Sequence, residues 1–191
     1  MSIEIKISKK RIPYKIAMRY LNKRVEEVKK GTNRELLWIL EHPTTYTAGV
    51  SFNKKEIIDK KIKIIKSNRG GKITLHNPGQ KIIYFVIDLN NRKKDIRKFI
   101  NSIEESIIQF LKSYKIQSKK DKKNIGIWVK DEKIAAIGIR VSRWVAYHGC
   151  SINISNNLNQ YLKIIPCGLD NKKVTSIFKL ISIKPKKFEN D

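Results

Sequence analysis

A run of six apolar residues limits the architectures open to this chain more than any other feature of its sequence. The run covers residues 82–87, inside a strand that we expect over residues 81–89. Because successive side chains of a strand point to opposite faces, a strand that is apolar at every position needs cover on both sides. The sequence therefore predicts a sheet with other elements packed against both faces. The run is far shorter than the roughly 20 residues that cross a bilayer, so no membrane span is expected.

Three segments have the apolar spacing of amphipathic helices. The first follows Pro13, which favours a helix start, and it ends near Gly31. The second follows Asp95, a typical capping residue, and its apolar stripe continues to Leu111 over about four turns. A shorter helix is expected within residues 172–181, and the charged tail from about residue 184 is expected to be frayed.

Four other segments are expected to form strands, at residues 35–41, 125–130, 133–141 and 150–155. The two strands that flank residues 130–132 are close enough in the sequence to pair as a hairpin. No repeat or linker divides the 191 residues, and an apolar content of 40% is sufficient for a core. We therefore expect one α/β (α+β) domain over residues 1–191, with helices flanking a mixed central sheet.

The net charge of +25 favours acidic partners. A basic surface speeds encounter both with nucleic acid and with acidic carrier proteins. The lysines, however, are spread along the whole chain, and Lys, Ile and Asn are frequent throughout, as in products of AT-rich genomes. A selected binding surface and compositional drift therefore remain equally open explanations of the charge.

The cysteine count favours a reducing compartment. Cys150 and Cys167 are the two cysteines, and a small secreted fold stapled by disulfides normally has more. The first residues alternate charged side chains with isoleucine, without the uninterrupted apolar stretch of a secretory signal. A cytoplasmic protein with reduced thiols is expected.

Four segments rich in glycine, proline and polar residues carry the sequence's chemical signals. They are RGGKITLHNPGQ at residues 69–80, KIAAIG at residues 133–138, HGCSIN at residues 148–153 and IPCGL at residues 165–169. Together they resemble the lipoyl(octanoyl) transferases of the biotin/lipoate protein ligase-like superfamily, over about residues 41–176. The sequence departs from the family's pattern at Asn77, where glycine is usual, so the turn there is expected to be strained or differently shaped. The C-terminal region also looks short.

The resemblance implies an acyltransferase that moves octanoate from octanoyl acyl carrier protein to a lysine of lipoyl domains, the first step of protein lipoylation. The implied acceptors are the apo lipoyl domains of 2-oxoacid dehydrogenase complexes and the glycine-cleavage carrier protein. A thioester donor is already activated, so no cofactor, neither ATP nor a metal, is expected.

Cys167 is the expected nucleophile and Lys133 its expected partner. Cys167 lies between Pro166 and Gly168, on a turn where backbone N–H groups are free to bind an oxyanion. An ordinary thiol is mostly protonated at neutral pH and needs a cationic neighbour to react. An ammonium about 4 Å from the sulfur would favour the thiolate by roughly 4 kcal/mol. Lys133 opens an otherwise apolar strand, and the family's pattern selects it from the many lysines.

The remaining site residues follow from the resemblance. The acyl group and its thioester are expected to contact three groups of residues: Arg69, Gly70, Gly71, Lys72, Ile73, Thr74, Leu75 and His76; Ala136, Ile137 and Gly138; and His148, Gly149, Cys150 and Ser151. Cys150 alternates with polar neighbours along its strand, so we expect it in the core and without a catalytic role. His42 precedes Pro43, and either a structural or a site role is open for it.

The sequence also bears on other classes of function. The spacing of the histidines and cysteines matches no common zinc pattern. The segment at residues 69–71 would suit an anion, but no Walker pattern or dinucleotide fingerprint accompanies it. An ATP-dependent lipoate or biotin protein ligase shares the fold and does not need a Pro-Cys-Gly nucleophile. A basic RNA-binding module would be expected to interleave aromatic and basic residues in a recognisable motif, and none is present, so we expect no nucleic-acid partner.

Overall fold

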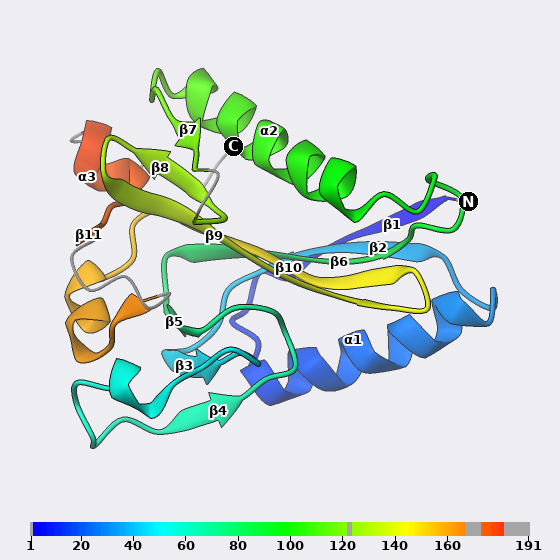
Figure 1. Cartoon of the computed structure of the whole chain (residues 1–191), viewed down its shortest axis with the longest axis horizontal. Helices are drawn as coiled ribbons and strands as arrows, with labels where there is room; N and C mark the ends of the chain where they lie inside the picture. Colours follow the sequence, from blue (N-terminus) through cyan, green and yellow to red (C-terminus); the bar gives the residue numbers. More distant parts are fainter. Residues whose placement is uncertain (1, 122–123, 167–172, 182–191) are drawn as a thin grey trace.

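A mixed sheet crosses the middle of the part of the chain that the computed structural model describes, residues 2–121, 124–166 and 173–181 (Figure 1). In spatial order its strands are β1 (Ile3–Ile7), β2 (Glu35–Leu40), β6 (Gln80–Asp88), β10 (Val145–Asn153), β9 (Glu132–Ser142), β8 (Ile127–Val129) and β7 (Lys119–Lys120), and β11 (Lys173–Val174) pairs with β9. β1 is parallel to β2 and β11 to β9, whereas the other neighbours are antiparallel. The predicted mixed sheet and the β8–β9 hairpin are confirmed.

The apolar run lies inside this sheet, as predicted. β6 is hydrogen-bonded to β2 on one side and to β10 on the other. Its Tyr84 and Val86 pack in a cluster with residues of α1 (Tyr14–Lys29), whereas Phe85 and Ile87 pack with residues of α2 (Ile96–Ser113). The two helices therefore cover opposite faces of the sheet (Figure 1).

Both long helices begin where the sequence indicates. α1 begins immediately after Pro13, and Gly31 follows its end with φ +70°. The Asp95 carboxylate accepts a hydrogen bond from the Lys98 amide at 2.8 Å, which caps the first turn of α2.

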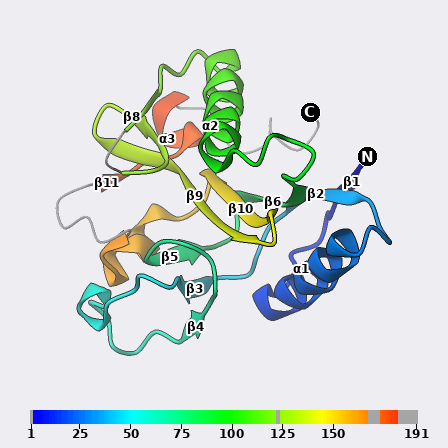
Figure 2. The ribbon, with the colours of Figure 1, turned by 45° about the vertical axis from the view of Figure 1, so that its right-hand side comes forward.

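A second, smaller sheet was not predicted. It consists of β3 (Thr45–Ala48), β4 (Ile64–Lys66) and β5 (Ile73–His76), and a short 3-10 helix (Lys54–Glu56) lies between its first two strands. β5 belongs to the segment 69–80, where the glycines at both ends suggest a loop. Figures 1 and 2 show this sheet on the same side of the large sheet as α1, and this arrangement positions the segment 69–76 over β9 and β10.

Two predicted boundaries are wrong. β10 begins at Val145 rather than at residue 150, because Arg143 and Trp144 form the tight turn, both with positive φ, and β10 pairs from there with β9 and β6. The last helix, α3 (Ile177–Ile181), is shorter than the expected 172–181, because Lys173 and Val174 pair with Glu132 and Lys133 as a strand. Residue 172 and the tail from 184 lie outside the described residues.

Candidate active site

Four small residues of β9 and β10 form a trough on the side of the sheet that faces β5. Gly149 pairs with Gly138 and Ser151 with Ala136, so the four positions form a square with almost no side-chain volume. The two rows continue on β6, where Ile82 pairs with Ser151 and Tyr84 with Gly149. All four residues line a cavity above the strands, which is narrowest over Gly138, where Gly70 O and Arg69 Cδ would lie 3.3 Å and 3.4 Å from a Cβ.

The segment 69–76 covers this trough. It encloses with β6, β9 and β10 a cavity of about 620 Å³. The Arg69 guanidinium holds the segment in shape, because it donates to the carbonyl oxygens of Gly70, Thr47 and Lys72 at 2.8–2.9 Å. The Gly70 amide donates to the Ile139 carbonyl at 3.1 Å, so the segment is fixed directly to β9.

Fourteen of the fifteen expected substrate-binding residues line the cavity. They are Arg69, Gly70, Gly71, Lys72, Ile73, Thr74, His76, Ala136, Ile137, Gly138, His148, Gly149, Cys150 and Ser151. Leu75 is fully buried in another cluster and does not line the cavity, because it faces away from its neighbours Thr74 and His76 on β5.

The backbone amides of the segment 69–71 are further candidate donors to an oxyanion, and two of them already have acceptors. The amides of Arg69 and Gly70 are already bonded, to the Ser67 hydroxyl and the Ile139 carbonyl. In the segment 69–71 this leaves the Gly71 amide as the candidate donor. Gly168, the other candidate position, lies outside the described residues.

Lys133 lines both the cavity and a small second pocket, and its surroundings are compact. Its side chain is buried, and Nζ donates to the Ile125 carbonyl at 3.0 Å and lies 5.0 Å from the centre of the Trp128 ring. A Cβ on Gly126 would be 2.9 Å from Lys133 Cε. The backbone before β8 and the indole ring therefore fix the position of the ammonium group.

The expected nucleophile, Cys167, lies outside the described residues. The chain on either side of it adjoins Lys133. Pro166 lines a small second pocket together with Lys133 and Thr74, and Val174 is the strand partner of Lys133. Thr175 continues this contact, because its amide donates to the Lys133 carbonyl at 3.0 Å.

His76 and His148 line the cavity as expected, and both are neutral. Burial, with Arg69 nearby, lowers the pKa of each imidazole to about 3. His148 has φ +70° in the middle of β10, and its Nε2 is 2.6 Å from Asn68 Oδ1. Its Nδ1 is buried without a hydrogen-bond partner among the described residues.

His42 has the structural role. It is fully buried, and its Nδ1 donates to the Ile12 carbonyl at 2.5 Å. Its Nε2 is therefore the acceptor for the Tyr84 hydroxyl, at 2.8 Å. His42 thus holds Tyr84, a residue that lines the cavity.

Cys150 is both a core residue and a wall residue. It packs in one cluster with Ile152 and Ile154, as its alternation predicted. Burial raises the pKa of its thiol to about 12, so it remains protonated at neutral pH.

Asn77 does not have the left-handed backbone that would strain a residue other than glycine. Its side chain is buried and donates to the Asn157 carbonyl at 2.9 Å and to Gln160 Oε1 at 3.0 Å. Asn156 donates in turn to Asn77 Oδ1. These bonds join the turn at residues 77–79 to the segment that leads to residue 167.

Comparison with known proteins agrees with this geometry. The family model of the lipoyl protein ligase A/B catalytic domain matches residues 13–190. The chain belongs to this family. Relatives named octanoyltransferase include those of Bartonella tribocorum (43% identity, 93% of this chain and 78% of the relative), Anaplasma phagocytophilum (43%, 93% and 88%) and the Wolbachia strain of Brugia malayi (40%, 99% and 94%).

Solved structures show the same fold. A putative lipoate protein ligase from T. acidophilum with bound lipoic acid superimposes with a TM-score of 0.76 at 13% identity, over 97% of this chain and 80% of that one. A lipoate-protein ligase A bound with ATP gives 0.72 at 12% identity, over 96% and 80%. The resemblance and the fold class predicted from the motifs are confirmed, and this family member is an enzyme of the acyltransferase class.

The cavity of this family member is also lined by residues outside the predicted set. They are Tyr14, Ser51, Ile82, Tyr84, Ile100, Asn124, Ile125 and Ile139.

Within the described residues, no group of three or more His, Cys, Asp or Glu side chains is placed to hold a metal ion. Nor does any described helix have the length and apolar character needed to cross a membrane.

The buried histidines predict a pH-dependent stability. His148 changes its pKa from 6.5 when unfolded to about 3 when folded, so the unfolded chain binds more protons between these values. The stability that this neutral imidazole contributes is present above pH 6.5 and is lost as the pH falls toward 3. Between pH 7 and pH 5 the loss is about 2 kcal/mol for this one histidine.

Urea unfolding at both pH values tests this, with His148→Asn as the comparison. Asparagine tolerates the left-handed φ of this position. The variant's free energy of unfolding should fall between pH 7 and pH 5 by about 2 kcal/mol less than that of the wild type. Equal falls in the two proteins would show that His148 becomes charged in the folded state.

Proposed function

We propose that this protein transfers octanoyl groups from octanoyl acyl carrier protein to a lysine of lipoyl domains, through a thioester on Cys167 and with Lys133 as its proton-transfer partner. The proposal is supported first by the chain's relatives, which are named octanoyltransferases. The observation that carries the finer claim is the position of Lys133 between the two ends of the segment that contains Cys167.

Covalent geometry limits where Cys167 can be. Its Cα is about 3.8 Å from that of Pro166, and Pro166 lines a pocket with the Lys133 side chain. On the other side the chain is anchored again by the pairing of Lys173 and Val174 with Glu132 and Lys133. The described residues on both sides of position 167 thus adjoin Lys133, which supports its choice as the partner of Cys167.

The charges around the cavity favour a thiolate. Arg69, Lys72 and Lys133 line it, and none of the described lining residues is Asp or Glu. Lys72 is partly neutralised by Glu56, at 3.3 Å. An anion gains several kcal/mol from a cation at about 4 Å in such surroundings. This cationic lining supports a nucleophilic rather than an inert cysteine at this site.

In the first half-reaction the thiolate attacks the donor thioester, with the Gly71 amide available to the oxyanion, and Lys133 gives its proton to the departing pantetheine thiol. In the second half the neutral Lys133 takes a proton from the incoming lysine amine, which attacks the acyl-enzyme. The carbon–sulfur bond breaks, an amide forms and Cys167 is released. The reaction needs a free thiol, which suits the cytoplasm.

The partners follow from this chemistry. An acidic carrier protein suits the net charge of +25. The acceptors we propose are the apo lipoyl domains of 2-oxoacid dehydrogenase complexes and the glycine-cleavage carrier protein, as the motif resemblance implies. A ligase that activates a free acid with ATP is the competing function, since solved ligases share the fold.

The acyl-enzyme is the first testable consequence. Incubation with octanoyl acyl carrier protein, without ATP, should add one octanoyl group, and peptide mass spectrometry should locate it on Cys167. Cys167→Ser should show no adduct. Cys150→Ser should still form it, with a loss of mainly stability, because the buried Cys150 thiol remains protonated. A strict requirement for ATP, or an adduct on Cys150, would contradict the proposal.

Lys133→Arg separates the two half-reactions. Arginine keeps the positive charge but does not give up a proton at neutral pH. The variant should form some acyl-enzyme and then fail to pass the group to a lipoyl domain, with a transfer rate reduced by about 100-fold or more. Single-turnover transfer from preformed acyl-enzyme measures this. Wild-type transfer by the variant would remove Lys133 from the mechanism.

Gly126→Ala tests the position of the ammonium group. The new Cβ would be 2.6 Å from the Ala135 carbonyl oxygen and 2.9 Å from Lys133 Cε, at φ +134°. Displacement of a reacting group by about 1 Å can reduce a rate by about 100-fold, so formation of the acyl-enzyme should slow to that extent.

Gly31→Ala is the matched control, since Gly31 also has positive φ but no atom lies within 4 Å of its Cβ position. It should lose stability and keep its rate. Equal rates in the two folded variants would show that Gly126 does not position Lys133.

A further inference from the structure

We infer that the Tyr84 ring, held by His42, forms the end wall that limits the acyl chain to about eight carbons, and that the path to it runs over Ala136, Ser151 and Gly149, beside Gly138. The inference rests on the proposed function and concerns the length of chain that the same site accepts. It follows from the order of the lining residues, from their register across three strands and from the way in which Tyr84 is held.

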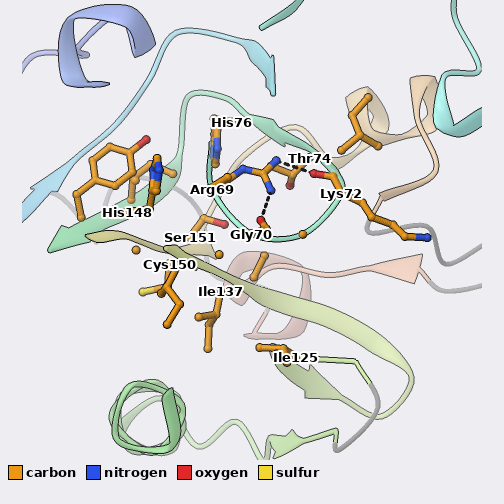
Figure 3. A pocket seen from close by; sticks show the side chains of 18 of the residues that line it. Arg69, Gly70, Lys72, Thr74, His76, Ile125, Ile137, His148, Cys150 and Ser151 are labelled. Carbon is orange, nitrogen blue, oxygen red and sulfur yellow. Dashed lines mark hydrogen bonds between the residues drawn. The ribbon is translucent and has the colours of Figure 1, made fainter. Parts of the chain in front are cut away.

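The residues that line the cavity follow one another in rows that begin near Lys133. Thr74, Ala136 and Ser151 line both the large cavity and the small pocket that contains Lys133 and Pro166, so this row is nearest to the proposed thioester. Gly138 and Gly149 lie two residues further along their strands, about 7 Å away. His76 lies two residues beyond Thr74 on β5, on the side of His148 (Figure 3). The floor of the cavity, formed by β9 and β10, and its ceiling, formed by the segment 69–76, therefore both extend away from Lys133.

The Tyr84 side chain blocks the cavity in that direction. It is in register with Gly149 and Gly138, so its ring stands at the end of the row of glycines. The path from Ala136 on β9 to Tyr84 on β6 crosses two strand spacings, about 10 Å, and runs two residues along the strands, about 7 Å, so the two positions lie about 12 Å apart. Contact between the end of a chain and the ring takes up about 3.5 Å of this distance, which leaves about 9 Å for the chain. An extended eight-carbon chain with carbon–carbon bonds of about 1.5 Å is about 9 Å long. The trough and the chain therefore have matching lengths.

The wall is held rigidly. The Ile12 carbonyl fixes the proton of His42 on Nδ1, so Nε2 must accept from the Tyr84 hydroxyl. On the other side of the chain end, His76 stacks with Tyr14 at 6.1 Å and is held through Nδ1 by Gln80 Oε1. Gln80 has no freedom to turn its amide, because Nε2 donates to Asn153 and Tyr161. Each aromatic ring around the chain end thus has a fixed partner.

A second direction is available in the cavity, beneath α2. Cys150 and Ile137 point to that side of the strands (Figure 3), and Ile100 of α2 lines it. The trough is favoured because its first row, Thr74, Ala136 and Ser151, shares a pocket with Lys133 and Pro166. Cys150, Ile137 and Ile100, which lie in the second direction, do not line that pocket. The experiment distinguishes the two directions.

The test compares acyl chains of four to twelve carbons on the carrier protein, offered as an equimolar mixture, and reads the acyl-enzyme masses. Each accommodated methylene changes the preference by about fourfold. Tyr84→Leu should raise the ratio of dodecanoyl to octanoyl at least tenfold, because the wall recedes. Tyr84→Phe keeps the ring and should keep octanoyl as the preferred chain.

Gly138→Ala should shift the preference the other way, toward hexanoyl. The new Cβ fits if its neighbours give by a few tenths of an ångström, since it would be 3.3 Å from the Gly70 oxygen and 3.4 Å from Arg69 Cδ. If Tyr84→Leu does not fold, Tyr14→Leu takes its place on the same wall. Unchanged profiles in the folded wall and trough variants would overturn the inference, as would a shift caused by Ile100→Ala alone.

A non-covalent measurement keeps the two proposals distinct. Calorimetry on the Cys167→Ser protein with octanamide and dodecanamide should show the same change in length preference when Tyr84→Leu is added. If no donor acylates the wild type but this preference changes, the thioester mechanism fails and the end wall stands. If acylation proceeds and no variant changes the preference, the end wall fails and the transferase stands.

Discussion

The close contact between the segment 69–72 and strand β9 is the interaction on which the rest of the site depends. The Gly70 amide bonds to the Ile139 carbonyl, and the Arg69 guanidinium binds three carbonyl oxygens of the same small region. Because buried backbone groups must be paired, these bonds fix the height of the ceiling above the sheet. The cavity beneath it is then set by the small side chains of β9 and β10.

Burial beneath this contact governs the charge of the lining histidines. It lowers the pKa of both imidazoles to about 3, and the nearby Arg69 guanidinium adds a smaller effect. The imidazoles are consequently uncharged walls, suited to an apolar chain, while the charged groups of the lining remain at Arg69, Lys72 and Lys133.

The sequence predicts the parts of this protein in which local pattern and packing agree. The apolar run of β6, the stripe of α2 and the motif residues that line the cavity are all of this kind. β5 was missed because the glycines at residues 70, 71 and 79 surround it, and the pairing of Thr45–Ala48 with Ile73–His76 depends on distant residues. Tyr14 and Tyr84 were missed because their sequence positions are those of ordinary core residues, and only the fold brings them to the end of the trough. A tyrosine inside an apolar strand is a usable signal, since its buried hydroxyl needs a partner.

The chain is rich in Lys, Ile and Asn, but no residue with a side chain can replace Gly149. A Cβ there would lie 1.9 Å from the Ile83 carbonyl oxygen, so even the smallest side chain forces two central strands apart. No neighbouring substitution relieves this, because the obstacle is backbone. A bias of the genome toward A and T can therefore add lysine and asparagine to the exterior of the molecule, but it cannot replace the glycine at this position. Genes whose base composition drifts far toward A and T must still keep a glycine codon here.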